Sequence, residues 1–207
     1  TRAQRRALDE LLSLWGLRFS QAPLDLDAVF GRSAPRVMEI GFGDGGNLIE
    51  IAAASPEVDF IGVEVHPPGI GHCLLGIESR ALTNVRVIAH DAVEVLEAQI
   101  SPDSLDEVLL YFPDPWPKKR HHKRRIVQAA FVAMVADRLK PGGAFRLATD
   151  WEPYAEWMRE VLAAEPRLSS APPTGQFLEA SARGITRFEA RGRRLGHRVF
   201  DLCYQRI

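Results

Sequence analysis

The feature that most constrains the fold of this chain is a regular alternation, between residues 36 and 164, of short apolar runs and segments with helical periodicity. The apolar runs predict β-strands at residues 36–40, 59–63, 85–89, 105–112 and 143–149. The helical segments lie at residues 46–54, 68–81, 92–100, 124–139 and 151–164. Parallel strands need crossover connections of this kind, so the pattern predicts an α/β fold with a mostly parallel central sheet and helices on both faces.

The pattern changes in the last forty or so residues. Residues 166–175 are rich in proline and serine and predict a loop. Two further strands, at residues 185–189 and 197–206, are joined by the turn-like sequence ARGRRLG, and we expect them to form a C-terminal antiparallel pair. With 207 residues and 46% hydrophobic content, the chain is long enough for one well-buried domain, so we expect residues 1–207 to form a single domain.

Cysteine usage and hydropathy exclude several classes of protein. Cys73 and Cys203 have neither a CxxC partner nor metal-ligand spacing, which is typical of thiols in a reducing cytoplasm. No apolar run reaches the length of a membrane span, and the N-terminus lacks the apolar stretch of a signal peptide. We therefore expect a cytoplasmic protein without a metal or a membrane contact, and a monomer, with a homodimer as the alternative.

Charge is strongly segregated along the chain although the net charge is only −1. Residues 39–114 hold 14 acidic and 2 basic side chains, whereas residues 115–207 hold 18 basic and 9 acidic ones. This asymmetry indicates a basic face for an anionic partner and an acidic half suited to a cationic or hydroxyl-rich small molecule. The alternative is that many of these charges only solvate helix faces.

The segment 111–125, YFPDPWPKKRHHKRR, carries the most specific chemistry. Asp114 lies between Pro113 and Pro115, which fix the backbone and remove N–H donors, so its carboxylate is presented from a stiff loop at the end of a predicted strand. Six cations follow within eleven residues. A presented carboxylate beside a basic run suits a site that receives a polyanion, and nucleic acid fits that description.

Carboxylates also lie at or near the ends of all five predicted strands, and they are Glu39, Glu64, Asp91, Asp114 and Asp150. In an open parallel sheet, ligands bind outside the carboxyl ends of the strands. Helix capping explains Asp91 and Asp150 equally well, but it does not explain all five. The sequence therefore predicts a ligand site along this edge of the sheet.

The glycines of the first strand-to-helix turn leave two cofactors open. Gly41, Gly43 and Gly46 satisfy the dinucleotide pattern GxGxxG, with Glu64 about 20 residues on as a ribose-binding acid. A pyrophosphate prefers an electropositive turn, whereas Glu39 and Asp44 place negative charge here. S-adenosylmethionine has no phosphate and carries ammonium and sulfonium groups, so the charge favours it over NAD. Glu64 would then accept the ribose hydroxyls, and Asp91 the adenine amino group.

Several motifs, in this order, resemble those of bacterial tRNA (guanine-N7)-methyltransferases: EIGFGDGG, IGVEVHPPGIG, HDAVEVL, FPDPWPKKRHHKRR, LATDWEPYAEWM, TRFEARG and LGHRVFDL. The resemblance covers nearly the whole chain. It implies a class I, Rossmann-like methyltransferase fold, S-adenosylmethionine as cofactor, and transfer of its methyl group to N7 of guanosine 46 in the variable loop of tRNA. Family members commonly carry a basic segment before the first helix, and this sequence starts almost at that helix; a missing segment would affect tRNA affinity and not the catalytic site.

The resemblance also implies roles for individual residues. The cofactor would be bound by Glu39, Gly41, Gly43, Glu64, Asp91, Ala92 and Asp114, with Asp114 also catalytic. The substrate would be contacted by Lys118, Asp150, Thr186, Arg187, Phe188 and Glu189. The RNA would be contacted by Arg120, His121, His122, Lys123, Arg124 and Arg125.

The chemistry of guanine N7 limits what Asp114 has to do. N7 is a lone-pair nucleophile, so we expect Asp114 to orient the base and stabilise its positive charge rather than remove a proton. Asp150 and Glu189 are second candidates for the guanine edge. Trp116 and Trp151 either stack on a base or pack within the protein. An NAD-dependent enzyme and a non-catalytic RNA-binding module are the alternative functions.

Overall fold

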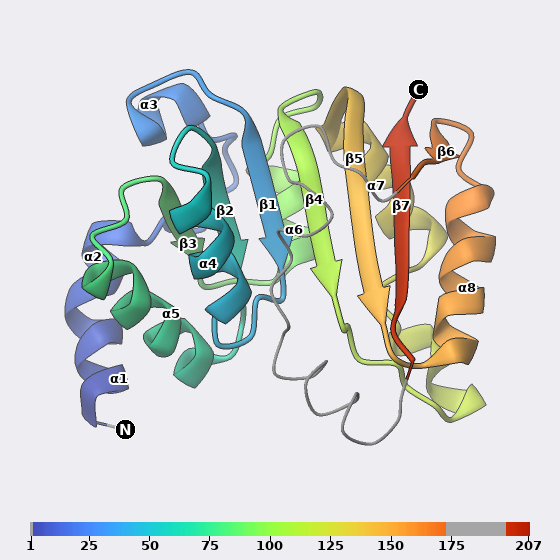
Figure 1. The fold of residues 1–207 in the computed structure, drawn as a ribbon, viewed down its shortest axis with the longest axis horizontal. Helices are drawn as coiled ribbons and strands as arrows, with labels where there is room; N and C mark the ends of the chain where they lie inside the picture. Colours follow the sequence, from blue (N-terminus) through green and yellow to red (C-terminus); the bar gives the residue numbers. More distant parts are fainter. Residues whose placement is uncertain (1, 173–197) are drawn as a thin grey trace.

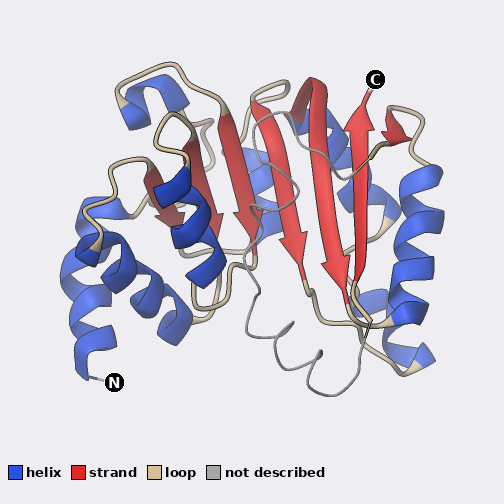
Figure 2. Ribbon diagram, viewed as in Figure 1, coloured by secondary structure: helices blue, strands red, loops and turns tan. Residues whose placement is uncertain are grey.

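The computed structural model describes residues 2–172 and 198–207. Within these residues, seven strands form one sheet in the order β3-β2-β1-β4-β5-β7-β6 (Figures 1 and 2). The strands are β1 (Arg36–Ile40), β2 (Asp59–Val63), β3 (Val85–Ile88), β4 (Leu105–Tyr111), β5 (Leu139–Thr149), β6 (Leu168–Ser170) and β7 (Phe200–Arg206). The first five pair in parallel, and β7 runs antiparallel to both β5 and β6. The predicted α/β class and mostly parallel sheet are confirmed.

Helices cover both faces of this sheet. They are α1 (Arg2–Arg6), the π-helix η1 (Ala7–Leu11), α2 (Leu12–Trp15), α3 (Leu26–Phe30), α4 (Gly46–Ala54), α5 (Pro67–Ser79), α6 (Ala92–Ala98), the 3-10 helix η2 (Lys119–Arg124), α7 (Ala129–Arg138) and α8 (Glu152–Ala163). In Figure 1, α4 lies in front of the sheet, and α6 and α7 lie behind it. None of the described helices is both long and apolar enough to cross a membrane.

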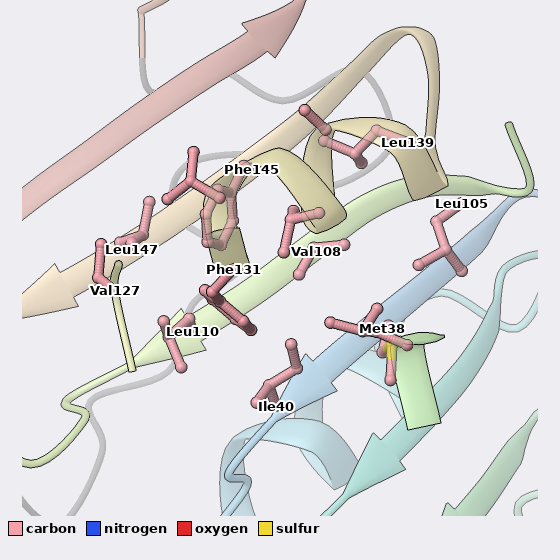
Figure 3. Close-up of a cluster of buried hydrophobic side chains, with 14 of the residues drawn as sticks. Met38, Ile40, Leu105, Val108, Leu110, Val127, Phe131, Leu139, Phe145 and Leu147 are labelled. Atoms are coloured by element: carbon pink, nitrogen blue, oxygen red, sulfur yellow. The ribbon is translucent and has the colours of Figure 1, made fainter. Parts of the chain in front are cut away.

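Side-chain alternation along the strands divides the core into two layers. Val108 and Leu110 of β4 point to the face that α7 covers, where they join Phe131 and Phe145 (Figure 3). Leu109 points to the opposite face and packs with residues of α4 and α5. Because successive strand residues face opposite sides and both sides are covered, the strands are mainly apolar, which is why short apolar runs marked them in the sequence.

The helix predicted at residues 124–139 differs more from the structure than the other predicted helices do. The α-helix α7 begins only at Ala129, after the 3-10 helix η2 and a non-helical connection. The amide of Gln128 donates to the carbonyl oxygens of His122 (3.0 Å) and Arg125 (3.2 Å), and the Gln128 backbone is extended with φ −122° and ψ 161°. These local hydrogen bonds hold the connection open and override the helical periodicity of the sequence.

Two strands also differ from their prediction. β5 begins at Leu139 instead of residue 143, because Leu139 pairs with Leu105. The next pair is Glu107 with Ala144, so the extra residues of β5 form a β-bulge between the two pairs. β6 lies within the predicted loop 166–175, where three residues pair with the end of β7. β6 and β7 therefore form one antiparallel pair near the C-terminus, whereas the predicted strand at 185–189 and its pairing lie outside the described residues.

The topology defines where a ligand site would form. The chain order reverses between β1 and β4, which lie side by side with Ile40 paired to Leu110. The arrowheads of β1, β4 and β5 point to the same, lower edge in Figure 1. In open α/β sheets ligands bind beyond the carboxyl ends of the strands at such a reversal, so the residues after β1 and β4 form the centre of the candidate site.

Candidate active site

The turn after β1 depends on glycine for its backbone shape. Gly41, Gly43 and Gly45 have φ values of 68°, 62° and 78°, in the left-handed region. A Cβ atom at Gly43 would meet nothing within 4 Å, whereas one at Gly45 would lie 2.5 Å from Cys73 Sγ. The turn is thus packed against α5 at Gly45, whereas the space on the Cβ side of Gly43 is open.

Glu39 is a buried carboxyl group directly beneath this turn. Its side chain belongs to the last residue but one of β1, is 3% exposed, and accepts hydrogen bonds from Asn47 Nδ2 at 3.1 and 3.2 Å. Burial raises the pKa of Glu39 to about 8; the Asn47 hydrogen bond opposes this shift, and the charge of Asp44 adds to it. A cation near the turn would stabilise the ionised form of Glu39. It would thereby offset both the cost of burying that charge and its repulsion by Asp44.

Glu64 connects the end of β2 to the glycine turn. Its carboxylate accepts hydrogen bonds from the backbone N–H groups of Gly43 (2.8 Å), Val65 (2.7 Å) and His66 (3.0 Å). The sequence predicted Glu64 as an acceptor for ribose hydroxyls but could not show these backbone partners. Glu64 therefore also has a structural role, because it holds the turn in place.

Asp91 caps helix α6. Its Oδ1 atom accepts hydrogen bonds from Val93 N at 2.9 Å and Glu94 N at 3.2 Å. The sequence left open whether Asp91 caps a helix or belongs to a ligand site, and the structure shows that it caps α6. The two capping bonds both fall on Oδ1, so capping itself makes no use of Oδ2. Ala92 is the first residue of α6 and lies next to this carboxylate.

The loop after β4 presents Asp114 at the edge of the sheet. Phe112 N donates to Ala148 O at 2.8 Å, which anchors the start of the loop to β5. Phe112 and Trp116 have φ values of 51° and 43°, an uncommon backbone conformation for residues of this size. Asp114 lies between these two positions, and its side chain is exposed.

The basic segment that follows, residues 118–125, contains both exposed and buried cations. Exposed cations are Lys118, Lys119, Arg120, Lys123 and Arg124. The Arg124 guanidinium lies 5.0 Å from the centre of the Trp116 ring, and the His121 ring meets the same indole edge-on at 5.8 Å. Trp116 therefore packs within the loop, one of the two roles that the sequence left open for it.

Arg125 differs from its predicted role. Only 3% of the residue is exposed, and its Nε atom donates to Pro115 O at 2.9 Å. Its guanidinium carbon lies 4.7 Å from the ring centre of Tyr154 and 5.6 Å from that of Trp157. A side chain enclosed in this way is not presented to RNA. The sequence alone did not distinguish Arg125 from the other cations of the basic run, because its aromatic neighbours come from a helix about 30 residues further on.

The remaining predicted residues lie beside β5 or outside the described chain. Asp150 follows Thr149, the last residue of β5, and is half-buried. Trp151 N donates to Thr149 Oγ1 at 3.2 Å, and the Trp151 side chain is 39% exposed. The predicted substrate residues 186–189 lie outside the described residues. Among the residues that the structure describes, no group of three His, Cys, Asp or Glu side chains is placed to hold a metal.

Solved structures with the same arrangement define the class of protein. The aminoglycoside resistance methyltransferase NpmB1 superposes with a TM-score of 0.60 at 14% identity, over 91% of this chain and 95% of its own. A SAM-dependent methyltransferase from Aquifex aeolicus gives a TM-score of 0.56 at 10% identity, over 88% of both chains. At these identities the likeness concerns the fold alone. The fold is the Rossmann-like fold of these methyltransferases.

Sequence relatives identify the family. The model of a family described as putative methyltransferase matches residues 33–202. The tRNA (guanine-N(7)-)-methyltransferase of Pseudomonas syringae pv. syringae is 53% identical over all of this chain and 85% of its own length. That of Shewanella woodyi is also 53% identical, over all of this chain and 87% of its own. The chain belongs to the tRNA (guanine-N7)-methyltransferase family and is a methyltransferase, which confirms the resemblance found in the sequence.

Proposed function

We propose that the protein transfers the methyl group of S-adenosylmethionine to N7 of guanosine 46 in the variable loop of tRNA, in the cytoplasm. The observation that carries this proposal is the arrangement at the reversal of the sheet. There β1 ends in the buried carboxyl of Glu39, and the adjacent β4 leads into the exposed Asp114 and the cations of η2. One side of the site thus suits a small cation and the other a polyanion.

The residues around the glycine turn fit S-adenosylmethionine better than a dinucleotide. Residues 41–46 contain no cation, and Asp44 among them supplies a negative charge. The buried carboxyl of Glu39 beside them becomes negative when a cation binds nearby. A pyrophosphate would meet repulsion there, while the ammonium group of an amino acid would be attracted. We assign Glu39 and Asp44 to the charge of the methionine part, Glu64 to the ribose and Asp91 to the adenine.

Methyl transfer to guanine N7 requires the protein to align the two reactants and to stabilise the positive charge that forms on the base. When bound, S-adenosylmethionine would supply an electrophilic methyl group. The lone pair of guanine N7, which carries no proton, would form the new N–C bond as the S–C bond breaks and S-adenosylhomocysteine leaves. The purine becomes cationic as this happens. The protein therefore has to hold the base in line and to place negative charge near the ring.

Asp114 suits that role through its position and its environment. Its loop lies next to the end of β1, and the prolines on either side restrict its backbone. A carboxylate there can accept hydrogen bonds from the N1–H and amino edge of guanine, which fixes the orientation of the ring. The same negative charge favours the cationic product over the neutral base.

Nucleoside mass spectrometry tests this function. The protein would be incubated with S-adenosylmethionine and an unmodified tRNA, and with the same tRNA carrying adenosine at position 46. We expect 7-methylguanosine in the first reaction and none in the second. If both tRNAs yield 7-methylguanosine, the methylated residue is not guanosine 46. A product other than 7-methylguanosine would show that N7 of guanine is not the methylated atom. Binding of tRNA without any product would favour the RNA-binding module.

A further inference from the structure

The Asp114 loop cannot hold its own shape with backbone hydrogen bonds. Pro113, Pro115 and Pro117 lack N–H groups, so only every second residue of this stretch can donate. The backbone is also held in the left-handed region at Phe112 and Trp116. Backbone in such regions persists only where the surroundings impose it, so the loop depends on donors that come from elsewhere.

Arg125 supplies such a donor, ten residues further along the chain. Its Nε atom donates to the carbonyl oxygen of Pro115, the residue next to Asp114, at 2.9 Å. Its terminal nitrogen lies 3.1 Å from Nε2 of His122, within η2. One planar guanidinium thus connects the loop with the basic helix that follows it.

The guanidinium is itself held in place by helix α8. It lies over the rings of Tyr154 and Trp157, which are one helical turn apart and share a face of that helix. Trp157 Nε1 donates to Val127 O at 2.7 Å, and the Tyr154 hydroxyl accepts from Val127 N at 3.4 Å. A continuous set of contacts therefore leads from the rigid helix α8 to the Asp114 loop.

Burial of a charged side chain is unfavourable unless its interactions repay it. Arg125 is 3% exposed, and burial lowers its pKa. In this buried position its Nε donates to the loop carbonyl while its guanidinium carbon lies over two aromatic rings. Lysine could keep the charge but not this geometry, because an ammonium group has no plane to stack and no fork of donors.

We propose that Arg125 is a positioning residue that fixes the Asp114 loop in the conformation used for methyl transfer, by donating to Pro115 while stacked on Tyr154 and Trp157. This inference rests on the function proposed above. It assigns to Arg125 an effect on the rate of transfer and not on the affinity for tRNA.

Two substitutions of Arg125 test this role. Arg125→Lys keeps the charge, and Arg125→Met keeps only the apolar stem. For both we expect the single-turnover rate of methylation at saturating tRNA and cofactor to fall by about 10-fold to 100-fold. The dissociation constant for tRNA and its salt dependence should stay within about 2-fold of the parent, since the side chain does not face RNA.

The neighbouring exposed cation provides the matched variant. Lys123→Met should weaken tRNA binding and lower its salt slope, an effect that Arg125→Met should not show. A parental rate in Arg125→Lys together with weaker tRNA binding in Arg125→Met would mean that Arg125 is an RNA contact, and would overturn the proposal. A loss of rate that is matched by a loss of the folded fraction at the assay temperature would also overturn it.

Amide hydrogen exchange of residues 112–124 separates this inference from the function on which it rests. In Arg125→Lys we expect faster exchange in this segment and parental exchange in β1 to β3. If the parent protein makes no 7-methylguanosine, the proposed function fails, and the exchange measurement still decides whether Arg125 holds the loop. Unchanged exchange in residues 112–124 would show that it does not.

Discussion

At the scale of single residues, Glu39 has the most strongly altered ionisation among the acids of the site. Because its pKa is raised to about 8, the ligand-free protein holds a proton on Glu39 at pH 7. A cationic ligand favours the carboxylate form, so binding lowers this pKa and the proton leaves. The unfolded chain would already have lost the proton at that pH, because an ordinary Glu titrates near 4.3.

We therefore expect S-adenosylmethionine binding at pH 7 to release about one proton per molecule bound. Calorimetric titrations in two buffers with different ionisation enthalpies measure this number directly. The release should decline as the pH rises through 8, since Glu39 is then ionised before binding. Glu39→Gln is the matched control and should release none. Equal proton release in the two proteins would place the cofactor charge away from Glu39.

Asp114 belongs to the same scale, and its charge can be tested separately from its shape. Asp114→Asn is nearly isosteric but lacks the negative charge, so we expect single-turnover methylation to slow by about 10²-fold or more. Cofactor affinity can also fall, but by less than the rate. Because no proton has to be removed from N7, the parental rate should not rise with pH in the way a general base requires. A parental rate in Asp114→Asn would limit Asp114 to shaping the loop.

At the scale of elements, the helix η2 carries cations that are exposed among the described residues. Lys123 and Arg124 are exposed on it. Substituting both with alanine removes two charges, and if both meet phosphates the slope of log affinity against log salt should decrease by about 2. Filter binding at several salt concentrations measures the slope. Cofactor affinity should not change.

A control for this effect is available on α5. Arg80, at the end of that helix, forms an ion pair with Glu50 of α4. Arg80→Ala removes a charge far along the sheet from η2 (Figure 1) and should leave the slope unchanged. If both variants lower the slope equally, the tRNA responds to total charge and not to this helix.

Elements that depend on local pattern were predictable, and those that depend on distant partners were not. The five parallel strands and the glycine turn follow from apolar runs and from residues that tolerate positive φ. The start of α7 and the burial of Arg125 were not predictable, because both depend on side chains packed around η2 and α8. β6 has three residues, and only its pairing with β7 makes it a strand. Glu64 was identified as a site residue, but its backbone partners require the folded turn.

At the scale of the whole molecule, the division of charge in the sequence becomes a division in space. β4 lies in the middle of the sheet, with β1, β2 and β3 on one side and β5, β7 and β6 on the other (Figure 1). The strands and helices of residues 39–114 therefore occupy the acidic side. The described residues after 114 hold thirteen basic and seven acidic side chains and form the basic side. The candidate site lies where the two sides meet.

This separation gives the described residues an electric dipole moment directed along the sheet. In the field of a polyanion a dipole experiences a torque before any contact is made. An approaching tRNA would therefore rotate the protein until its basic side, which includes η2, faces the RNA. The range of this effect is set by screening, which has a length of about 8 Å at physiological ionic strength. Encounters would thus begin with the basic side of the molecule, and η2 on it, already turned towards the RNA.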